Sequence, residues 1–102
     1  MRRLLFHPEA RAELVAAIRY HEAERPGYGA KFRDEARAVI ERASELPGVG
    51  QRERGYPDGL DVRAFQFDLF PYAVIVVVEE DELLVVAVAH GRRFPGYWRT
   101  RL

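Results

Sequence analysis

The C-terminal tail, residues 90–102, carries the residue types best suited to chemistry or binding. It begins with His90, whose side chain can exchange a proton near neutral pH, and Tyr97 and Trp98 follow. The tail holds four arginines and no acidic residue: Arg92, Arg93, Arg99 and Arg101. Guanidinium groups bind phosphate and carboxylate oxygens, and they also stack on aromatic rings. We therefore expect the tail to contact a phosphate backbone, an acidic partner or both, unless its aromatics pack on the core and its arginines are solvated.

The overall charge limits how this tail can be used. The chain has 102 residues, with 16 basic and 16 acidic side chains, and its formal net charge is zero. Any binding to nucleic acid must therefore come from a local patch. The absence of cysteine excludes disulfides, thiolate metal sites and a cysteine nucleophile, and it fits a cytoplasmic protein. No apolar run has the length of a membrane span, so we expect one domain, residues 1–102, without membrane contact.

Other ionisable residues show no pattern of a metal site. The acidic run 79–82 could collect a divalent cation, but neighbouring acids on a tight turn point apart, so a solvated turn is expected. His7 and His21 lack the paired ligands of a zinc site. We expect neither a metal nor another cofactor.

The elements that must position the tail follow from hydrophobic spacing. The spacing predicts one helix from Pro8 to about Glu24 and a second along the stripe from Tyr28 to Leu46, broken by Arg25–Gly29 and stopped by Pro47. Only a short break separates the two, which favours a helical hairpin.

Strands dominate the rest of the chain. They are expected at residues 2–6, 61–68, 72–78 and 83–89, with a further short strand at 51–55. The third and fourth are apolar on both faces, which predicts interior positions, and in the second Arg63 shares a face with Phe65 and Phe67. The order β-α-α-β-β-β predicts an α+β domain in which the helical hairpin packs on a mostly antiparallel sheet.

Four motifs occur in this order along the chain. The first is a strand followed by Pro-x-Ala and a helix, at Phe6, Pro8, Ala10 and Leu14. The second is a Pro-Gly-x-Gly break followed by Phe and Glu, at Pro26, Gly27, Gly29, Phe32 and Glu35. The third is an arginine on a strand that leads to Phe-Pro-Tyr, at Arg63, Phe70, Pro71 and Tyr72. The last is His-x-x-Arg-x-Pro-x-Tyr-Trp-x-x-Arg, at His90, Arg93, Pro95, Tyr97, Trp98 and Arg101.

With these motifs the chain resembles the RelE/ParE superfamily of toxins from bacterial type II toxin–antitoxin systems, over nearly its whole length. The resemblance implies the same α+β fold, a small cognate antitoxin that wraps the toxin in a hetero-oligomer, and the bacterial cytoplasm. RelE-like members are ribosome-dependent mRNA endonucleases, whereas ParE-like members inhibit DNA gyrase. The neutral charge and the long helical hairpin place the chain closer to the ParE, or plasmid stabilisation, branch. An inactive homologue that only binds an antitoxin is a third interpretation.

The resemblance also implies site residues. In a nuclease, Arg63 and Arg93 would stabilise the charged phosphorane while Tyr97 or His90 moved the proton. Contacts with the target or with phosphate are expected from a further set: Arg52, Arg54, Arg92, Arg99 and Arg101. Structural anchors are expected at Pro95, Trp98 and Tyr72. The alternative for Arg63 and Arg93 is an ion pair with acids of the helices, and that for His90 is a hydrogen-bonded ring beneath the tail.

Overall fold

The computed structural model describes residues 2–56 and 59–102, and it begins with the predicted helical hairpin. Helix α1 spans Pro8–Glu24 and α2 spans Tyr28–Glu45. Pro8 suits the first helical position, and the backbone N–H of Glu9 donates to the ring of His7, 3.1 Å away. At the bend, Gly27 has a φ of 90°, and the carboxylate of Glu22 accepts its N–H at 3.0 Å. A short 3-10 helix, η1 (Pro47–Val49), follows α2, as the stop signal predicts.

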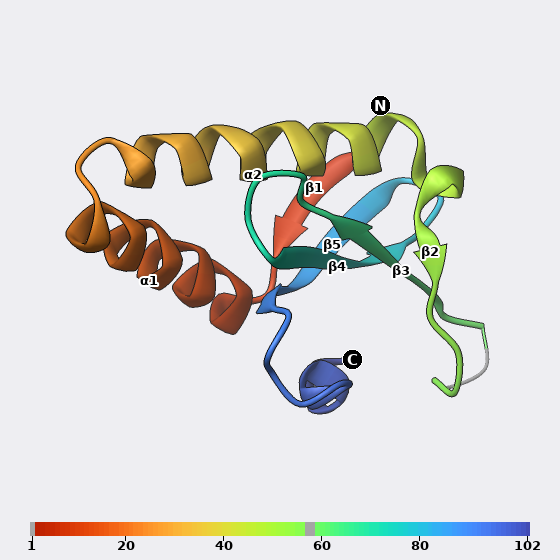
Figure 1. The fold of residues 1–102 in the computed structure, drawn as a ribbon. Helices are drawn as coiled ribbons and strands as arrows, with labels where there is room; N and C mark the ends of the chain where they lie inside the picture. The colour runs from red at the N-terminus through yellow and green to blue at the C-terminus, as the bar shows by residue number, and fades with distance from the viewer. Residues whose placement is uncertain (1, 57–58) are drawn as a thin grey trace.

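The sheet has the order β1-β5-β4-β3-β2. Its strands are β1 (Arg3–Phe6), β2 (Gln51–Arg52), β3 (Asp61–Gln66), β4 (Tyr72–Val78) and β5 (Glu82–His90). Strand β1 runs parallel to β5, and the other neighbours are antiparallel. Both helices cover one face, and a second 3-10 helix, η2 (Tyr97–Arg101), lies beyond the other (Figure 1). The predicted α+β fold, the mostly antiparallel sheet and the two interior strands are confirmed.

Strand β5 contains a β-bulge, and the C-terminal tail packs next to it. Its register with β4 pairs Val85 with Val76 and Ala87 with Ile75, so Val86 is an extra residue without a partner on β4. On the opposite side, the pairing with β1 ends at Phe6, because Pro8 turns the chain into α1. The second half of β5 therefore has an open edge next to α1.

Two hydrophobic clusters lie on the two faces of the sheet. The cluster between sheet and helices is centred on Phe32, which is fully buried and packs against Phe67, Phe70 and Tyr72. The cluster on the other face contains Trp98, 6% exposed, with these sheet residues: Val62, Ala64, Ile75, Val77, Val86, Ala87 and Ala89. Since a large buried side chain contributes about 1.5–3 kcal/mol, both faces of the sheet stabilise the fold.

The acidic run 79–82 forms the turn between β4 and β5, where the N–H of Glu79 donates to the carbonyl of Glu82 at 2.9 Å. This is the predicted solvated turn. Within residues 2–56 and 59–102, no group of three or more histidines and acids is arranged to hold a metal ion. In the same ranges, no helix has the length and apolar character that crossing a membrane requires.

Candidate functional site

The tail leaves the sheet at the end of β5 and makes a tight turn before η2. In this turn the N–H of Tyr97 donates to the carbonyl of Phe94 at 3.1 Å. Pro95 occupies the second position, and Gly96 occupies the third with a φ of 78°. This is the geometry of a type II turn, which needs a positive φ at its third position. The Pro-Gly pair of the sequence therefore sets the path by which the tail enters η2.

A buried ion pair docks η2 against α1 and β5. The guanidinium of Arg101 donates twice to the carboxylate of Glu13, at 2.9 and 3.0 Å. The Tyr97 hydroxyl donates to the same carboxylate at 2.7 Å, and so does the N–H of Val88 at 3.0 Å. Arg101 also donates to the carbonyl of Val86 at 3.0 Å, which is the unpaired residue of β5. The side chains of Arg101 and Glu13 are only 8% and 16% exposed. The structure thus places Arg101, expected at a partner surface, inside the domain.

The two candidates for proton transfer are both engaged in hydrogen bonds. Burial raises the pKa of Tyr97 strongly, and the hydrogen bond to Glu13 raises it further. A phenol that donates to a carboxylate cannot accept a proton at neutral pH. At His90, Nδ1 accepts the N–H of Arg92 at 2.9 Å. Nδ1 of His90 is thus already occupied as a hydrogen-bond acceptor.

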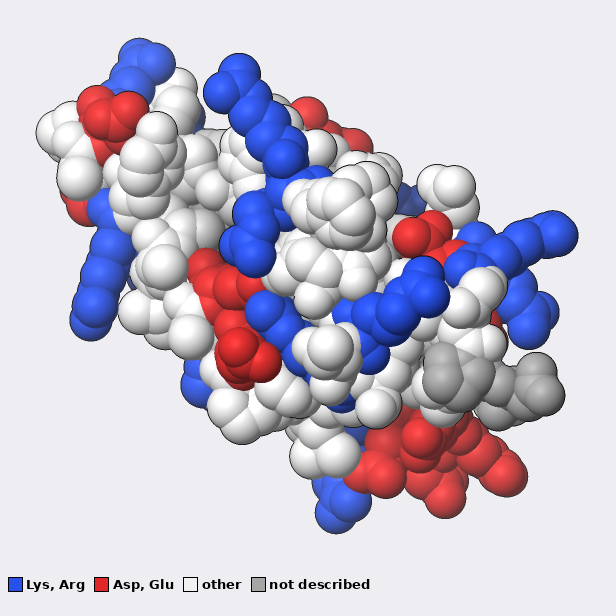
Figure 2. Space-filling view, turned by 90° about the horizontal axis from the view of Figure 1, so that it is seen from below, with Lys and Arg blue, Asp and Glu red and all other residues white. Residues whose placement is uncertain are grey.

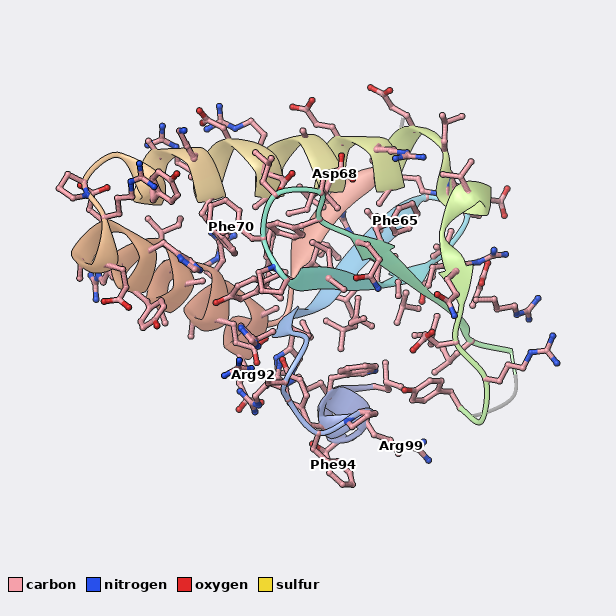
Figure 3. The ribbon with its side chains drawn as sticks, viewed as in Figure 1. Phe65, Asp68, Phe70, Arg92, Phe94 and Arg99 are labelled. Atoms are coloured by element: carbon pink, nitrogen blue, oxygen red, sulfur yellow. The ribbon has the colours of Figure 1, made fainter. Side chains whose placement is uncertain are left out.

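Another set of tail residues faces solvent. Phe94 is 79% exposed, and Figure 3 shows it pointing away from the sheet beside η2. Arg93 lies 3.9 Å above the ring of Tyr97, and Arg99 lies 4.9 Å from the ring of Tyr56. Among the described residues, no acidic side chain pairs with the exposed tail arginines, which are Arg92, Arg93 and Arg99. Figure 2, which views the molecule from below, shows several basic side chains on this face, with uncharged surface between them and acidic groups beside some of them.

Arg63 lies on the other face of the sheet. Its neighbour at the next alternate position, Phe65, belongs to the cluster beneath the helices. The guanidinium pairs with Asp61 of its own strand at 2.8 Å, rather than with an acid of the helices, and donates to the carbonyl of Gly50 at 3.1 Å. Arg93 instead lines a cleft on the face of Trp98. The structure therefore does not bring Arg63 and Arg93 together.

That cleft has a volume of about 290 Å³ and lies at the end of the sheet beside the tail. Its polar lining consists of Gln51, Glu53, Gln66, His90 and Arg93. Arg52 and Arg54 are exposed and line a separate hollow next to Tyr56. The cleft thus combines one arginine with one histidine, and the other predicted phosphate ligands lie elsewhere.

His21 and Glu13, which the sequence did not single out as site residues, both contact residues that it did, namely Tyr72 and the tail. Tyr72 is buried, 9% exposed; its hydroxyl lies 3.3 Å from Nε2 of His21, and its ring stacks edge-on with that of His90. Burial, and then the nearby His90, lower the pKa of His21. Glu13, which docks the tail, follows Ala10 by three residues and precedes Ala17 by four, and both alanines are buried. An acidic residue on the buried stripe of a helix is unusual, and this was the sequence signal that could have identified Glu13.

Comparisons with known proteins bear on the family and the fold. The family model "ParE toxin of type II toxin-antitoxin system, parDE" matches residues 4–95. A search of the curated proteins found no match. A solved structure described as a chromosomal ParDE toxin–antitoxin system from P. aeruginosa is similar in fold, with a TM-score of 0.71 at 16% identity, covering 88% of this chain and 96% of that one. The resemblance inferred from the four motifs is thus confirmed, since the family match spans most of the sequence. The chain belongs to the ParE toxin family of type II toxin–antitoxin systems.

Proposed function

We propose that this toxin acts by binding a protein target through its tail, without catalysing a reaction, and that the target is DNA gyrase. The observation that carries the proposal is the division of the tail into a buried part and an exposed part. Arg101 and Trp98 are fixed inside the domain, whereas Phe94 is 79% exposed among arginines that pair with no acid of residues 2–56 and 59–102. Gyrase is named because ParE-like members of the superfamily inhibit it. Family membership also implies a cognate antitoxin.

The exposed part has the character of a binding surface. Aromatic and arginine side chains supply most of the energy at protein interfaces, and their partners are complementary in charge. Phe94 offers an apolar side chain, and Arg92 and Arg99 offer cations on either side of it in sequence. The type II turn and the docked η2 hold these side chains before binding, which lowers the entropic cost of association. We expect the target surface to be acidic around an apolar pocket.

The same geometry argues against a nuclease. A metal-independent RNase needs a base for the 2′-hydroxyl, an acid for the leaving oxygen and cations for the phosphorane. The Tyr97 hydroxyl holds its proton and donates a hydrogen bond to Glu13, and Nδ1 of His90 already accepts the N–H of Arg92, so neither atom is free to take the proton of a 2′-hydroxyl. Arg63 lies on β3 and is bound to Asp61 and to the carbonyl of Gly50, whereas Arg93 lies in the tail beyond β5 and stacks on Tyr97. One observation favours the RelE-like alternative: the cleft of about 290 Å³ that holds Arg93 and His90.

The antitoxin is expected on the helix side of β1. A groove of about 260 Å³ between β1 and α2 is lined by Leu4, Phe6, Leu14, Ala36 and Ile40, with Arg33, Arg37 and Glu41 at its sides. Strand β1 forms the edge of the sheet, and Leu4 is 44% exposed. An extended antitoxin segment could add to this edge, with apolar side chains in the groove and acidic ones near the arginines.

Gyrase supercoiling with the purified chain tests the proposal. We expect inhibition, and we expect Phe94→Ala to weaken it at least about tenfold, as for a residue central to an interface. Leu69→Ala is the matched control, because Leu69 is 74% exposed but lies in the loop between β3 and β4. Full supercoiling at a large excess of toxin would contradict the gyrase target.

Two further assays separate the alternatives. Primer extension on translated mRNA after induction would reveal cleavage at A-site codons, and cleavage lost in Arg93→Ala would establish the nuclease. Growth arrest on induction without antitoxin would exclude the inactive homologue.

A further inference from the structure

We infer that Glu13 is the positioning residue that holds the tail in the geometry for target contact. The inference rests on the proposed function, in which the tail is the contacting surface. Glu13 itself lies on α1 and its side chain is only 16% exposed, so it acts through Tyr97 and Arg101 rather than by touching the target.

The position of Glu13 follows from the open edge of β5. Beyond Val85 this edge has no strand partner, because β1 ends at Phe6. The Glu13 carboxylate accepts the free N–H of Val88, and Arg101 donates to the carbonyl of Val86. The ion pair thus satisfies backbone groups that a longer β1 would have paired. The tail is therefore held at the part of the β5 edge that β1 does not cover.

The neighbouring aromatic ring adds packing but no hydrogen bond to this anchor. The indole N–H of Trp98 is buried and has no hydrogen-bond partner among the described residues, so packing alone holds that ring. Glu13 also sets the exposed residues indirectly. It fixes the Tyr97 ring, which lies 3.9 Å from the guanidinium of Arg93, and the N–H of Tyr97 closes the turn that presents Phe94.

The variant Glu13→Gln tests this role directly, because both oxygens of the carboxylate accept hydrogen bonds. One oxygen accepts from Val88 N–H and Arg101 Nη1, and the other accepts from Tyr97 OH and Arg101 Nη2. An amide has one oxygen, and its NH₂ group is a donor. In either orientation that NH₂ group would face an arginine N–H. The variant therefore preserves size, removes the negative charge and leaves at most one of the two oxygens to accept hydrogen bonds.

The experiment uses Trp98, the only tryptophan of the chain, as a reporter of tail docking. In Glu13→Gln we expect its emission to move to longer wavelength and its quenching by acrylamide to increase, while far-UV circular dichroism retains the helices. The ratio of docked to undocked tail should fall at least roughly a hundredfold, as for a broken buried pair. Growth inhibition should fall at least about tenfold, since the exposed tail residues lose their arrangement. The control is Glu9→Gln, one helical turn earlier, because Glu9 pairs with the same Arg101 but over a longer distance, 3.4 Å, and with its own side chain 66% exposed.

The outcomes separate the inference from the proposed function. Unchanged Trp98 emission in Glu13→Gln would overturn the inference. An exposed Trp98 with full growth inhibition would support docking by Glu13 and refute the tail as the contacting surface. If Glu13→Gln does not fold, Tyr97→Phe removes only one of the four bonds to the carboxylate and should give a smaller shift of the same kind. No shift in that variant would also count against the inference.

Discussion

Replacement of Arg101 by methionine should cost far more stability than its position near the C-terminus suggests. Its side chain is 8% exposed, and the guanidinium makes three hydrogen bonds of 2.9–3.0 Å, two to Glu13 and one to the carbonyl of Val86. Methionine fills part of the space but leaves the Glu13 carboxylate, 16% exposed, without a cation. Breaking a buried ion pair on one side costs about 3–5 kcal/mol. A domain of this size has about 5–15 kcal/mol in total, so the loss is a large fraction of it.

The measurement is denaturant unfolding followed by Trp98 fluorescence, with thermal melting beside it. A loss of 3–5 kcal/mol should lower the Tm by at least roughly 12 °C. Arg99→Met is the matched control, since Arg99 is exposed and contacts only the ring of Tyr56, at 4.9 Å, among the aromatic side chains. It should cost at most about 1 kcal/mol. Equal losses in the two variants would refute the reasoning. The double variant Glu13→Gln Arg101→Met should cost less than the sum of the single changes, because the two side chains are coupled.

Three further predictions concern other parts of the molecule. Gly50→Ala would place a Cβ 2.4 Å from an aromatic ring of β3 and should cost about 1–3 kcal/mol on thermal melting, whereas Gly48→Ala meets nothing within 4 Å and should cost less. Leu4→Asp should weaken antitoxin capture in a pulldown with the co-encoded protein and leave growth inhibition intact; unchanged capture would place the antitoxin elsewhere. Burial, and then His90, lower the pKa of His21 from 6.5, so its contribution to stability is complete above pH 6.5 and is lost as the pH falls through the lowered value. Urea midpoints at pH 7 and 5 should differ less in His21→Phe than in the original chain; an equal difference would exclude His21 as the cause.

Much of the fold could be predicted because it follows from local rules. The helices begin and end where proline and glycine place them, and β4 and β5 are interior because both faces are apolar. The pairing of β1 with β5 could not be predicted, because short strands of similar composition leave several arrangements open. The bulge at Val86 had no local signal either.

The candidate site divides in the same way. The Pro-Gly turn before η2 and the burial of Trp98 follow from residue type and neighbours. Alternation along β3 correctly grouped Arg63 with Phe65, but only the packed sheet shows that Arg63 pairs with Asp61 of its own strand, whereas Arg93 lines the cleft beside the tail. The role of Glu13 depends on β5 and on the tail, which are distant in sequence, and no local pattern connects them.

By itself, the sequence determined the helical hairpin, the interior strands, the family and the presence of an arginine-rich tail. Only the tertiary structure decided which of those arginines are available. Arg99 and Arg101 are two residues apart on one short 3-10 helix and are chemically identical, yet one is exposed and the other is 8% exposed. The difference arises from a carboxylate 88 positions away in the chain. Whether an arginine is buried or exposed depends on the groups that folding brings within hydrogen-bond distance of it. The sequence lists those groups but does not give their separations in space.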